Sequence, residues 1–394
     1  MIKIEKIKFR NILNSAGNIA LEVEITTDKN ISEKASIPSA IIQGKREVFA
    51  TNNLKNRDLN ELLKKICNTE IQDQKMFDSI LNEYIDELGV NICLSLSLAF
   101  ARVSAKNEQN SLVRYICKQA NHRMKRKSPT PLVAIFSGGV HNKKDSIQNI
   151  MLCVDIHPFS NAVKAIVEIY TDIESQLKEQ NVLKGYGNSS GMIVEKMTTN
   201  EKMDVIENTI KKLNYEKDVS IAIDVAAEHF YEKGNYVYEG ELIKPEQLNE
   251  TLREYVQNHN ITYVEDPFHF RDEKWWKIFK QENPNILVVG DDLFATQDKY
   301  IDSRLANGIV IKMNQVGTLT GSINAFQKAR SEKMITCVSH RSIETEDTFM
   351  CDLAVALNAE YIKIGGPRRG DRVTKYNQLL RLEEKIDESC NIWE

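Results

Sequence analysis

The sequence predicts an α/β protein in which a (β/α)8 barrel of the TIM type follows a small α+β domain. Six short apolar strands in the second half of the chain each end in a charged or ionisable residue, and helical patterns separate them. A parallel strand that is covered on both faces is a near-continuous apolar run. In a barrel, polar residues at the C-terminal strand ends point into one shared mouth, where the chemistry lies. The pattern therefore indicates an enzyme-type barrel, or a protein descended from one.

Residues 1–127 are predicted to form the small domain, and residues 128–394 the barrel. The small domain begins with three alternating strands and continues with four amphipathic helices. The strands are expected at 1–13, 18–28 and 33–42, and the helices at 57–68, 75–88, 92–105 and 111–121. Strands followed by helices are typical of an α+β domain. The linker MKRKSPTPL contains two of the chain's 8 prolines and marks the domain boundary.

Strand–helix alternation is expected to begin at Leu132 and to last almost to the C-terminus. The six strands that define the barrel are expected at 219–225, 261–267, 286–292, 308–314, 334–340 and 360–366. The helices between them are expected at 249–259, 272–282, 319–333 and 347–359. Strands that alternate with helices in this way favour a parallel sheet.

Composition and charge argue against several classes of protein. Hydrophobic residues make up 42% and charged residues 27% of the chain, as in an ordinary globular protein. The net charge of -4 gives no reason to expect nucleic acid as the main partner. The 7 cysteines lack a CxxC spacing and are typical of reduced thiols in a cytosolic protein. The N-terminus is charged and no long apolar run occurs, so we expect a cytoplasmic protein that does not span a membrane.

Three acids, Asp224, Glu265 and Asp291, stand at the ends of strands that can be neighbours in the barrel. Three converging carboxylates repel one another, and a divalent cation relieves that repulsion. Magnesium takes oxygen ligands and keeps positions open for water and for substrate oxygens. The alternative is that each acid caps the helix that follows its strand. The equivalent placement of all three acids favours a magnesium site.

Lys312 and Lys363 also end apolar strands, and their alternative role is that of barrel lysines whose charged heads reach solvent. Near a divalent metal and other cations the pKa of a lysine falls, so that it can act as a general base. His340, Arg341 and Ser342 offer donors suited to a phosphate, Arg341 bidentately, or alternatively form a capped loop. Magnesium, a lysine base and an anion clamp together imply proton abstraction α to a carboxylate.

Long motifs in the barrel half closely resemble those of the enolase family. They are VEDPF, VVGDDL, IKMNQVGTLTGSI, VSHRSIETEDTF and IKIGGPRRGDRVTKYNQLLRLEE. The likeness covers nearly the whole chain, and three further segments carry it: RNILNSAGNIALEVEI, GVNICLSLSLAFARVSA and FSGGVHNKKDSIQ. The resemblance implies an enolase-type barrel preceded by a capping domain.

The resemblance also implies roles for individual residues. Asp224, Glu265 and Asp291 would hold the tighter magnesium. Lys312 would be the base that removes the C2 proton of 2-phosphoglycerate. Lys363 would neutralise the carboxylate of this small phosphorylated substrate.

The rest of the implied site consists of residues that bind phosphate or line the pocket. Arg341 and Ser342 would bind the phosphate. The pocket-lining residues would be His141, Gln148 and His340, of which the two histidines are candidates for catalysis.

The resemblance further implies a homodimer. In enolases a glutamate on the N-terminal strand pairs across the dimer interface with an arginine of the C-terminal helix. The matching positions here are Glu22 in LEVEI and Arg381 in NQLLRLEE. Either residue alone could be an exposed charge of little energetic consequence, but the presence of both favours an interface.

Three departures from the family pattern concern the expulsion of hydroxide. Ser189 stands where a Gly-Asp-Glu-Gly-Gly loop has its glutamate, and Asn149 follows Gln148 where a second glutamate belongs. Ile42 replaces the serine that closes over a second magnesium. General-acid help is typically worth about 100- to 10,000-fold. We therefore expect slow dehydration, unless Asp145, His141 or a water substitutes.

Three functions are compatible with this pattern. The first is a divergent magnesium-dependent lyase that acts on 2-phosphoglycerate, phosphoenolpyruvate or a close analogue, including one that forms a phosphonate-type enolpyruvate. The second is a non-catalytic binding or scaffold protein with an enolase fold. The third, an enolase-superfamily racemase or cycloisomerase, is disfavoured by the intact His-Arg-Ser clamp. The retained lysines and metal acids favour the first.

Overall fold

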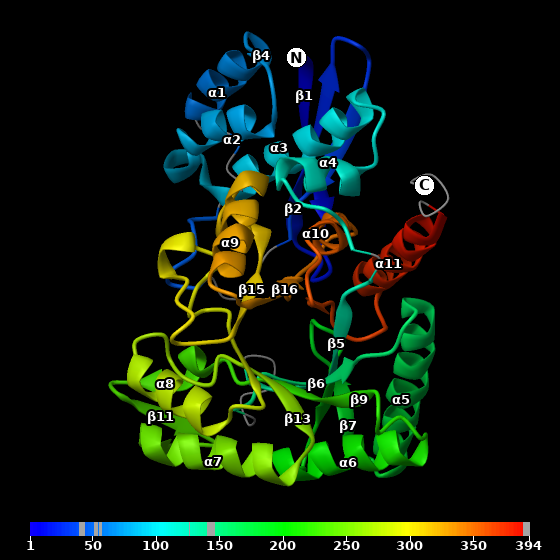
Figure 1. The fold of residues 1–394 in the computed structure, drawn as a ribbon, viewed down its shortest axis with the longest axis vertical. Helices are drawn as coiled ribbons and strands as arrows, with labels where there is room; N and C mark the ends of the chain where they lie inside the picture. Colours follow the sequence, from blue (N-terminus) through cyan, green and yellow to red (C-terminus); the bar gives the residue numbers. More distant parts are fainter. Residues whose placement is uncertain (39–43, 51–53, 55–56, 126, 140–145, 389–394) are drawn as a thin grey trace.

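The computed structural model describes the chain of 394 residues except 39–43, 51–53, 55–56, 126, 140–145 and 389–394. Figure 1 shows the elements of the first third of the chain, in blue and cyan, at one end of the molecule. The green and yellow helices of the barrel half, among them α6 and α7, lie at the opposite end. The predicted order of a small domain followed by a barrel therefore corresponds to two regions in space.

The N-terminal region consists of an antiparallel sheet of order β3-β2-β1-β4 and four helices. The strands are β1 (Ile2–Leu13), β2 (Ile19–Thr27), β3 (Ser32–Ser36) and β4 (Glu70–Ile71). The helices are α1 (Arg57–Cys67), α2 (Gln74–Asn82), α3 (Ile85–Asn107) and α4 (Leu112–Gln119). The α+β organisation and most of its element positions agree with the sequence.

The prediction of one helix over 75–88 was wrong. Helix α2 ends at Asn82, and α3 begins at Ile85 after Tyr84 has left helical geometry with φ -119 and ψ 3. Inside α3, Gly89 adopts φ 74 and ψ 163, which interrupts the helix and favours a residue without a side chain. The continuous apolar pattern of this segment does not reveal these two changes of direction.

Helix α3 is the one described helix that is long and apolar enough to cross a membrane by length and composition. In the fold, 94% of its apolar window is buried against other parts of the protein. Its neighbours include β2, β3 and α2, so its hydropathy serves core packing.

Eight strands form a closed barrel, which confirms the predicted fold class. In ring order they are β5 (Thr130–Ser137), β6 (Asn149–Val154), β9 (Val219–Asp224), β13 (Ile261–Glu265), β14 (Leu287–Gly290), β15 (Gly308–Ile311), β16 (Ile335–Ser339) and β17 (Tyr361–Lys363). The pairing of β17 with β5 closes the ring. The six strands predicted from apolar runs are all present.

The expectation of strict strand–helix alternation from Leu132 was wrong at the first turn of the barrel. Strand β6 follows β5 directly and is antiparallel both to β5 and to β9. The chain between Ser137 and Asn149 is shorter than the dozen or so residues that a crossover to a parallel neighbour requires. Short connections join antiparallel strands, so this pair reverses direction.

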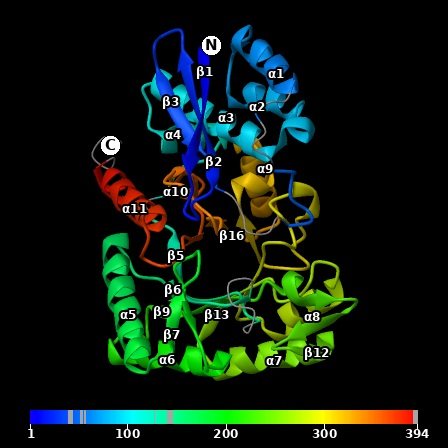
Figure 2. The same cartoon turned by 180° about the vertical axis from the view of Figure 1, so that it is seen from behind.

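Helices cover the outside of the barrel, as Figures 1 and 2 show. They are α5 (Phe159–Glu179), α6 (Thr199–Lys212), α7 (Pro245–Asn258), α8 (Glu273–Glu282), α9 (Leu319–Ser331), α10 (Phe349–Ala356) and α11 (Gly370–Glu388). A hairpin of β7 (Leu183–Tyr186) and β8 (Met192–Val194) extends the sheet beside β5. A small sheet of β10 (Tyr231–Glu232), β11 (Asn235–Tyr238) and β12 (Glu241–Ile243) precedes α7.

The barrel is filled with side chains. A separate apolar cluster inside the ring takes residues from most of the strands: Leu132, Met151, Cys153, Ala222, Tyr263, Val289, Val310 and Cys337 are its buried members. Inward-facing layers of this kind make a barrel interior a packed core. Polar side chains can therefore gather only above this core, at the mouth.

Candidate active site

The mouth of the barrel encloses a cavity of about 290 Å³. Most of the predicted site residues line it: Gln148, Asp224, Asp291, Lys312, His340, Arg341, Ser342 and Lys363. Glu265 is fully buried beneath the cavity and reaches it through Lys363. His141 lies outside the described residues. The strand ends thus bring together side chains that are far apart in the sequence.

Asp224 and Glu265 are adjacent because they are register partners at the ends of β9 and β13. Lys363, at the end of β17, extends its ammonium group between them. Its Nζ lies 2.7 Å from Oδ2 of Asp224 and 2.8 Å from Oε1 of Glu265. The hydroxyl of Tyr263 donates to Oε2 of Glu265 at 3.1 Å. Burial, followed by the neighbouring charge of Asp224, raises the pKa of Glu265 to about 7 although Lys363 opposes the shift.

Asp291 and Lys312 form an ion pair through Oδ2 and Nζ. Gln315 Nε2 donates to the other carboxylate oxygen of Asp291 at 3.2 Å. Burial alone would raise the pKa of Asp291, but the charges of Lys312, Lys363 and Arg341 and the hydrogen bond from Lys312 together outweigh burial, and the pKa is lowered. Burial likewise opposes ionisation of Lys312, yet the nearby acids, Asp291 foremost, raise its pKa. The expectation of a lowered lysine pKa concerns a site that holds a divalent metal, and it stays a prediction.

Two further acids, Asp266 and Asp292, belong to this cluster; the sequence places them at strand ends but gave them no role. Asp266 accepts hydrogen bonds from the backbone N–H groups of Asp291 at 2.9 Å and Asp292 at 2.7 Å. It thereby fixes the turn that follows β14. Asp292 lines the cavity, and burial together with the charge of Asp291 raises its pKa to about 7. The acidic pairs in VEDP and VVGDD were the sequence signal for both residues.

The donor set fits a hard divalent cation. Asp224, Glu265 and Asp291 offer only carboxylate oxygens, the ligands that Mg²⁺ prefers. Two lysines face these three acids, which leaves an excess of negative charge. Among the described residues, the carboxylate oxygens that lie within 4.8 Å of one another at the mouth belong to Asp266, Asp291 and Asp292. The predicted triad is wider, since Lys363 stands between two of its members.

The loop after β16 brings His340, Arg341 and Ser342 to the cavity. The N–H of His340 donates to the carbonyl of Lys363 at 3.0 Å, and the N–H of Arg341 donates to Oε1 of Glu344 at 2.8 Å. Burial, followed by the charges of Arg372 and the lysines, lowers the pKa of His340 well below its ordinary value. The loop is thus fixed by backbone bonds, and its three residues line the cavity.

Arg341 is already paired with a carboxylate. Nη1 and Nη2 lie 2.8 and 3.0 Å from the two carboxylate oxygens of Glu47, and the side chains are only 6% and 4% exposed. Glu47 belongs to a segment from the N-terminal region that lies over the cavity with Gly44 and Lys45. Sequence reasoning missed Glu47, because nothing in the local pattern connects it with a residue 294 positions later.

Neutral side chains occupy the two positions at which the family resemblance implies glutamates. Ser189 and Asn149 are each 4% exposed, and both line the cavity. Asn149 Nδ2 donates to Oδ2 of Asp224 at 3.3 Å, and Gln148 Nε2 donates to the same oxygen at 3.1 Å. Oδ1 of Asn149 has no hydrogen-bond partner among the described residues. Ile42 lies outside the part of the chain that the structure describes.

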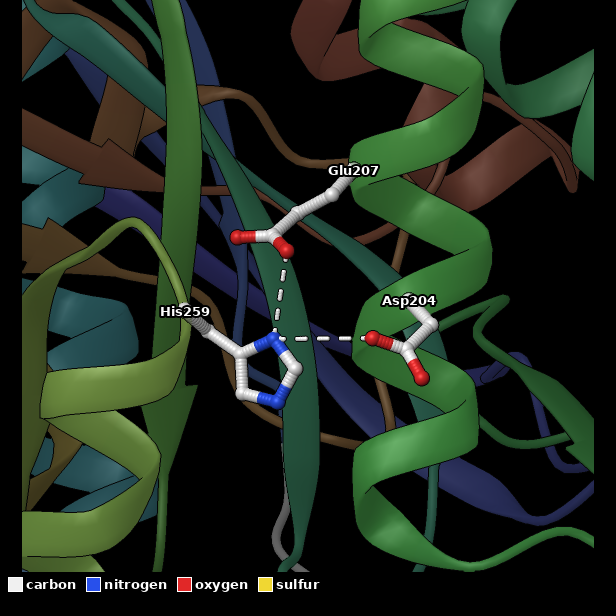
Figure 3. A group of neighbouring side chains, drawn as sticks. All are labelled: Asp204, Glu207 and His259. Atoms are coloured by element: carbon white, nitrogen blue, oxygen red, sulfur yellow. Dashed lines mark hydrogen bonds and ion pairs between the residues drawn. The ribbon is translucent and has the colours of Figure 1, made fainter.

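A second group of carboxylate and imidazole side chains lies on the outer helices. Figure 3 shows Asp204 and Glu207 on α6 facing His259, which follows α7. Nδ1 of His259 lies 3.2 Å from Glu207 and 4.0 Å from Asp204, while Nε2 lies 3.0 Å from Oδ1 of Asn200. None of these residues lines the cavity. The contacts fasten α6 to the segment that enters β13.

The fold and the mouth define an α/β-barrel protein of enzyme type with a smaller N-terminal region. Residues 125–392 match the family described as Enolase, C-terminal TIM barrel domain, and residues 4–116 match Enolase, N-terminal domain. An enolase of Beutenbergia cavernae is 30% identical over an alignment of 417 residues with its gaps. The alignment covers 99% of this chain and 97% of that protein. The chain belongs to the enolase family.

Proposed function

We propose that this protein is a divergent magnesium-dependent lyase of the enolase type. It would abstract the C2 proton of 2-phosphoglycerate, or of a close analogue, and form phosphoenolpyruvate or a related enolpyruvate. The observation that carries the proposal is the convergence of Asp224, Asp291, Lys312, Arg341 and Lys363 on one cavity. These residues come from five different strand ends and combine acids, a candidate base and anion-binding groups.

The substrate carries an anionic group at each end, and the cavity offers a cationic side chain for each of them. Arg341 and Ser342 would hold the phosphate, since a guanidinium matches its oxygens bidentately. Lys363 would neutralise the carboxylate. Magnesium, held by Asp224 and its two partner acids, would supply positive charge for the electrons that move onto that carboxylate.

Lys312 would take the C2 proton at Nζ. The ion pair with Asp291 must open first, because that carboxylate favours the protonated amine. Gln315 already donates to the second oxygen of Asp291, so the acid keeps a hydrogen bond when the lysine leaves. The ammonium would next release one proton to solvent water, and the neutral Nζ would then face C2 from the end of β15.

The second half of the reaction distinguishes this protein within its family. Ser189 and Asn149 supply no carboxylic acid at the wall where the leaving group would depart. The C–O bond would then break with its electron pair leaving on a hydroxide that no carboxylic acid at these two positions protonates. We therefore expect slow dehydration of 2-phosphoglycerate and faster turnover of an analogue whose leaving group is less basic, a phosphonate-forming substrate among them.

We also propose the finer assignments that accompany this function. The domains divide at residues 127 and 128, the protein acts in the cytoplasm, and two copies assemble through Glu22 and Arg381. In the single chain, Glu22 pairs with Arg10 and Lys34, each at 3.0 Å, and Arg381 is exposed on α11. An exposed arginine can meet an acid of a second copy.

Phosphorus NMR of the purified protein with Mg²⁺ and 2-phosphoglycerate tests the proposed lyase. We expect magnesium-dependent loss of the substrate resonance and growth of a product resonance, at a rate below that of ordinary enolases. Solvent deuterium at C2, detected in the same sample by proton NMR, reports enolisation before product accumulates. A sample that shows neither change over a day would contradict the proposal.

A further inference from the structure

Arg372 is a fully buried arginine in α11 whose guanidinium reaches the loop after β16. Nη1 contacts Nδ1 of His340 and donates to the carbonyl oxygen of Arg341 at 3.1 Å. Nη2 donates to the carbonyl oxygens of Ser342 at 2.8 Å and Asn188 at 3.0 Å. One side chain therefore holds three consecutive residues of the loop for which we propose phosphate binding.

The pair of Arg372 and His340 is confined on its other side by Gly365, which has φ +81. A β-carbon at Gly365 would lie 3.1 Å from Cε1 of His340 and 3.2 Å from Cδ of Arg372. It would also come within 2.6 Å of the carbonyl oxygen of Ser189, closer than real β-carbons approach. The position of the imidazole ring is thus set by tight packing as well as by the guanidinium.

The chemistry of arginine determines the tautomer of the ring. A guanidinium has five N–H donors and no acceptor. The ring nitrogen that faces it, Nδ1 of His340, must therefore accept and carry a lone pair. A neutral imidazole with an acceptor at Nδ1 carries its single proton on Nε2, at the ring edge away from Arg372. His340 lines the cavity, so this N–H is the donor that the ring offers there.

The surrounding charges favour the same neutral ring. The charged groups with the largest effect on the pKa of His340 are cations: Arg372, Lys363, Lys312 and Lys375. Each of them, like burial, disfavours a second proton on the imidazole. The geometry and these charges thus favour the neutral form of the ring.

We propose that Arg372 is a positioning residue that fixes His340 as the Nε2–H tautomer, a neutral hydrogen-bond donor to an anionic oxygen of the substrate. The contact with substrate rests on the proposed function, whereas the tautomer does not. A neutral imidazole is a poor acid, so His340 does not replace the carboxylic acids that are missing at Ser189 and Asn149.

The unmodified protein tests the tautomer directly. In protein labelled with ¹⁵N at its 7 histidines, two-bond ¹H–¹⁵N spectra distinguish the two neutral tautomers and the imidazolium. The signals of His340 are those that disappear in His340→Gln. We expect the Nε2–H pattern to stay unchanged between about pH 6 and 8, a range in which an ordinary histidine titrates. An Nδ1–H pattern or an imidazolium would overturn the proposal.

Two substitutions test whether Arg372 is the cause. Arg372→Lys keeps a donor toward Nδ1 and should keep the Nε2–H pattern, whereas Arg372→Met should give a mixture of tautomers. Arg372→Met should also lose one hydrogen bond to an anionic oxygen of the substrate, so its KM for 2-phosphoglycerate should increase about 10-fold. In Arg372→Lys the KM should return most of the way to that of the unmodified protein. A pure Nε2–H pattern in folded Arg372→Met would contradict the role of Arg372. An Nε2–H pattern without any turnover would count against the proposed lyase and leave the positioning role standing.

Discussion

Two sets of residues in the cavity differ in the kind of chemistry that they retain. One set, the charged wall, joins Asp224, Glu265 and Asp291 to Lys312 and Lys363 through ion pairs at the strand ends. The other set consists of Ser189 and Asn149, neutral residues at the two positions where the family resemblance implies glutamates, and Asn149 lies against the charged wall through its hydrogen bond to Asp224. General decay would not spare one set and change the other. For the proposed function, the difference would separate the formation of a carbanion at C2 from the expulsion of a leaving group at C3.

The largest effect is expected on the charged wall, from the loss of the candidate base. Lys312→Ala should reduce both solvent exchange at C2 and product formation by about 100- to 10,000-fold, the usual range for a general base. Proton NMR in deuterated buffer measures the exchange. Lys328→Ala, which removes a lysine paired with Glu332 on the outside of α9, is the matched control and should change neither rate. Equal rates in Lys312→Ala and the unmodified protein would remove Lys312 from the mechanism.

Metal binding on the same wall gives the next effect. Asp291→Asn should abolish the stabilisation of the protein by Mg²⁺, because a neutral amide replaces one of the three carboxylates. For the unmodified protein, magnesium at about 100 times its Kd should add about 2.7 kcal/mol, visible as a higher Tm. Asp302→Asn, at an exposed pair with Arg304, is the control and should respond to magnesium normally. An unchanged magnesium affinity in Asp291→Asn would overturn the site assignment.

In the cavity, Glu47 occupies the anion clamp at Arg341, and freeing Arg341 from Glu47 should have a smaller effect. Because Glu47 holds both terminal nitrogens of Arg341, any anion that enters must first displace it. Glu47→Gln should therefore bind inorganic phosphate about 10-fold more tightly in calorimetric titrations, the gain from one charged hydrogen bond. The same substitution in an Arg341→Gln background should change nothing. Weaker phosphate binding in Glu47→Gln would show that the glutamate assists the clamp.

Much of the charged wall was predictable from sequence, because each of its residues ends an apolar strand and the barrel fixes where strand ends meet. Asp224 and Glu265 meet for this reason, as register partners. The pairing of Arg341 with Glu47 was not predictable, since it depends on how the N-terminal region lies on the barrel. The ion pair of Lys312 with Asp291 was also not predictable, because the sequence does not show which acid lies nearest to the lysine.

In the fold, apolar periodicity located the six parallel strands but not the direction of β6. The direction of β6 follows from the connection between β5 and β6, which is too short for a helical crossover. Its cause is therefore the length of the connection and not the residue types in it. Periodicity also merged α2 with α3, because the turn at Tyr84 lies inside an apolar run. Arg372 was missed for a related reason, since a buried arginine in α11 has the same local pattern as an exposed one.

The smallest effect is expected on the surface, outside the cavity. It tests whether the surface, like the charged wall, keeps the family arrangement. Arg381→Glu should shift a homodimer toward monomer, because it would set two like charges against each other across the proposed interface at a cost of several kcal/mol. Light scattering at micromolar concentration measures the mass. Arg304→Glu, at a side chain that is 80% exposed and pairs with Asp302, should leave the mass unchanged. A monomeric mass for the unmodified protein would contradict the proposed dimer.

The difference between the charged wall and the two neutral positions, Ser189 and Asn149, is tested most directly by comparing two rates. Both rates are measured in one sample of the unmodified protein with Mg²⁺ and 2-phosphoglycerate in deuterated buffer. The account predicts that deuterium enters C2 faster than phosphoenolpyruvate forms, since Lys312 is present and carboxylic acids are absent at Ser189 and Asn149. Dehydration at ordinary enolase rates, with no excess of exchange, would contradict it and would require an acid that substitutes for both glutamates.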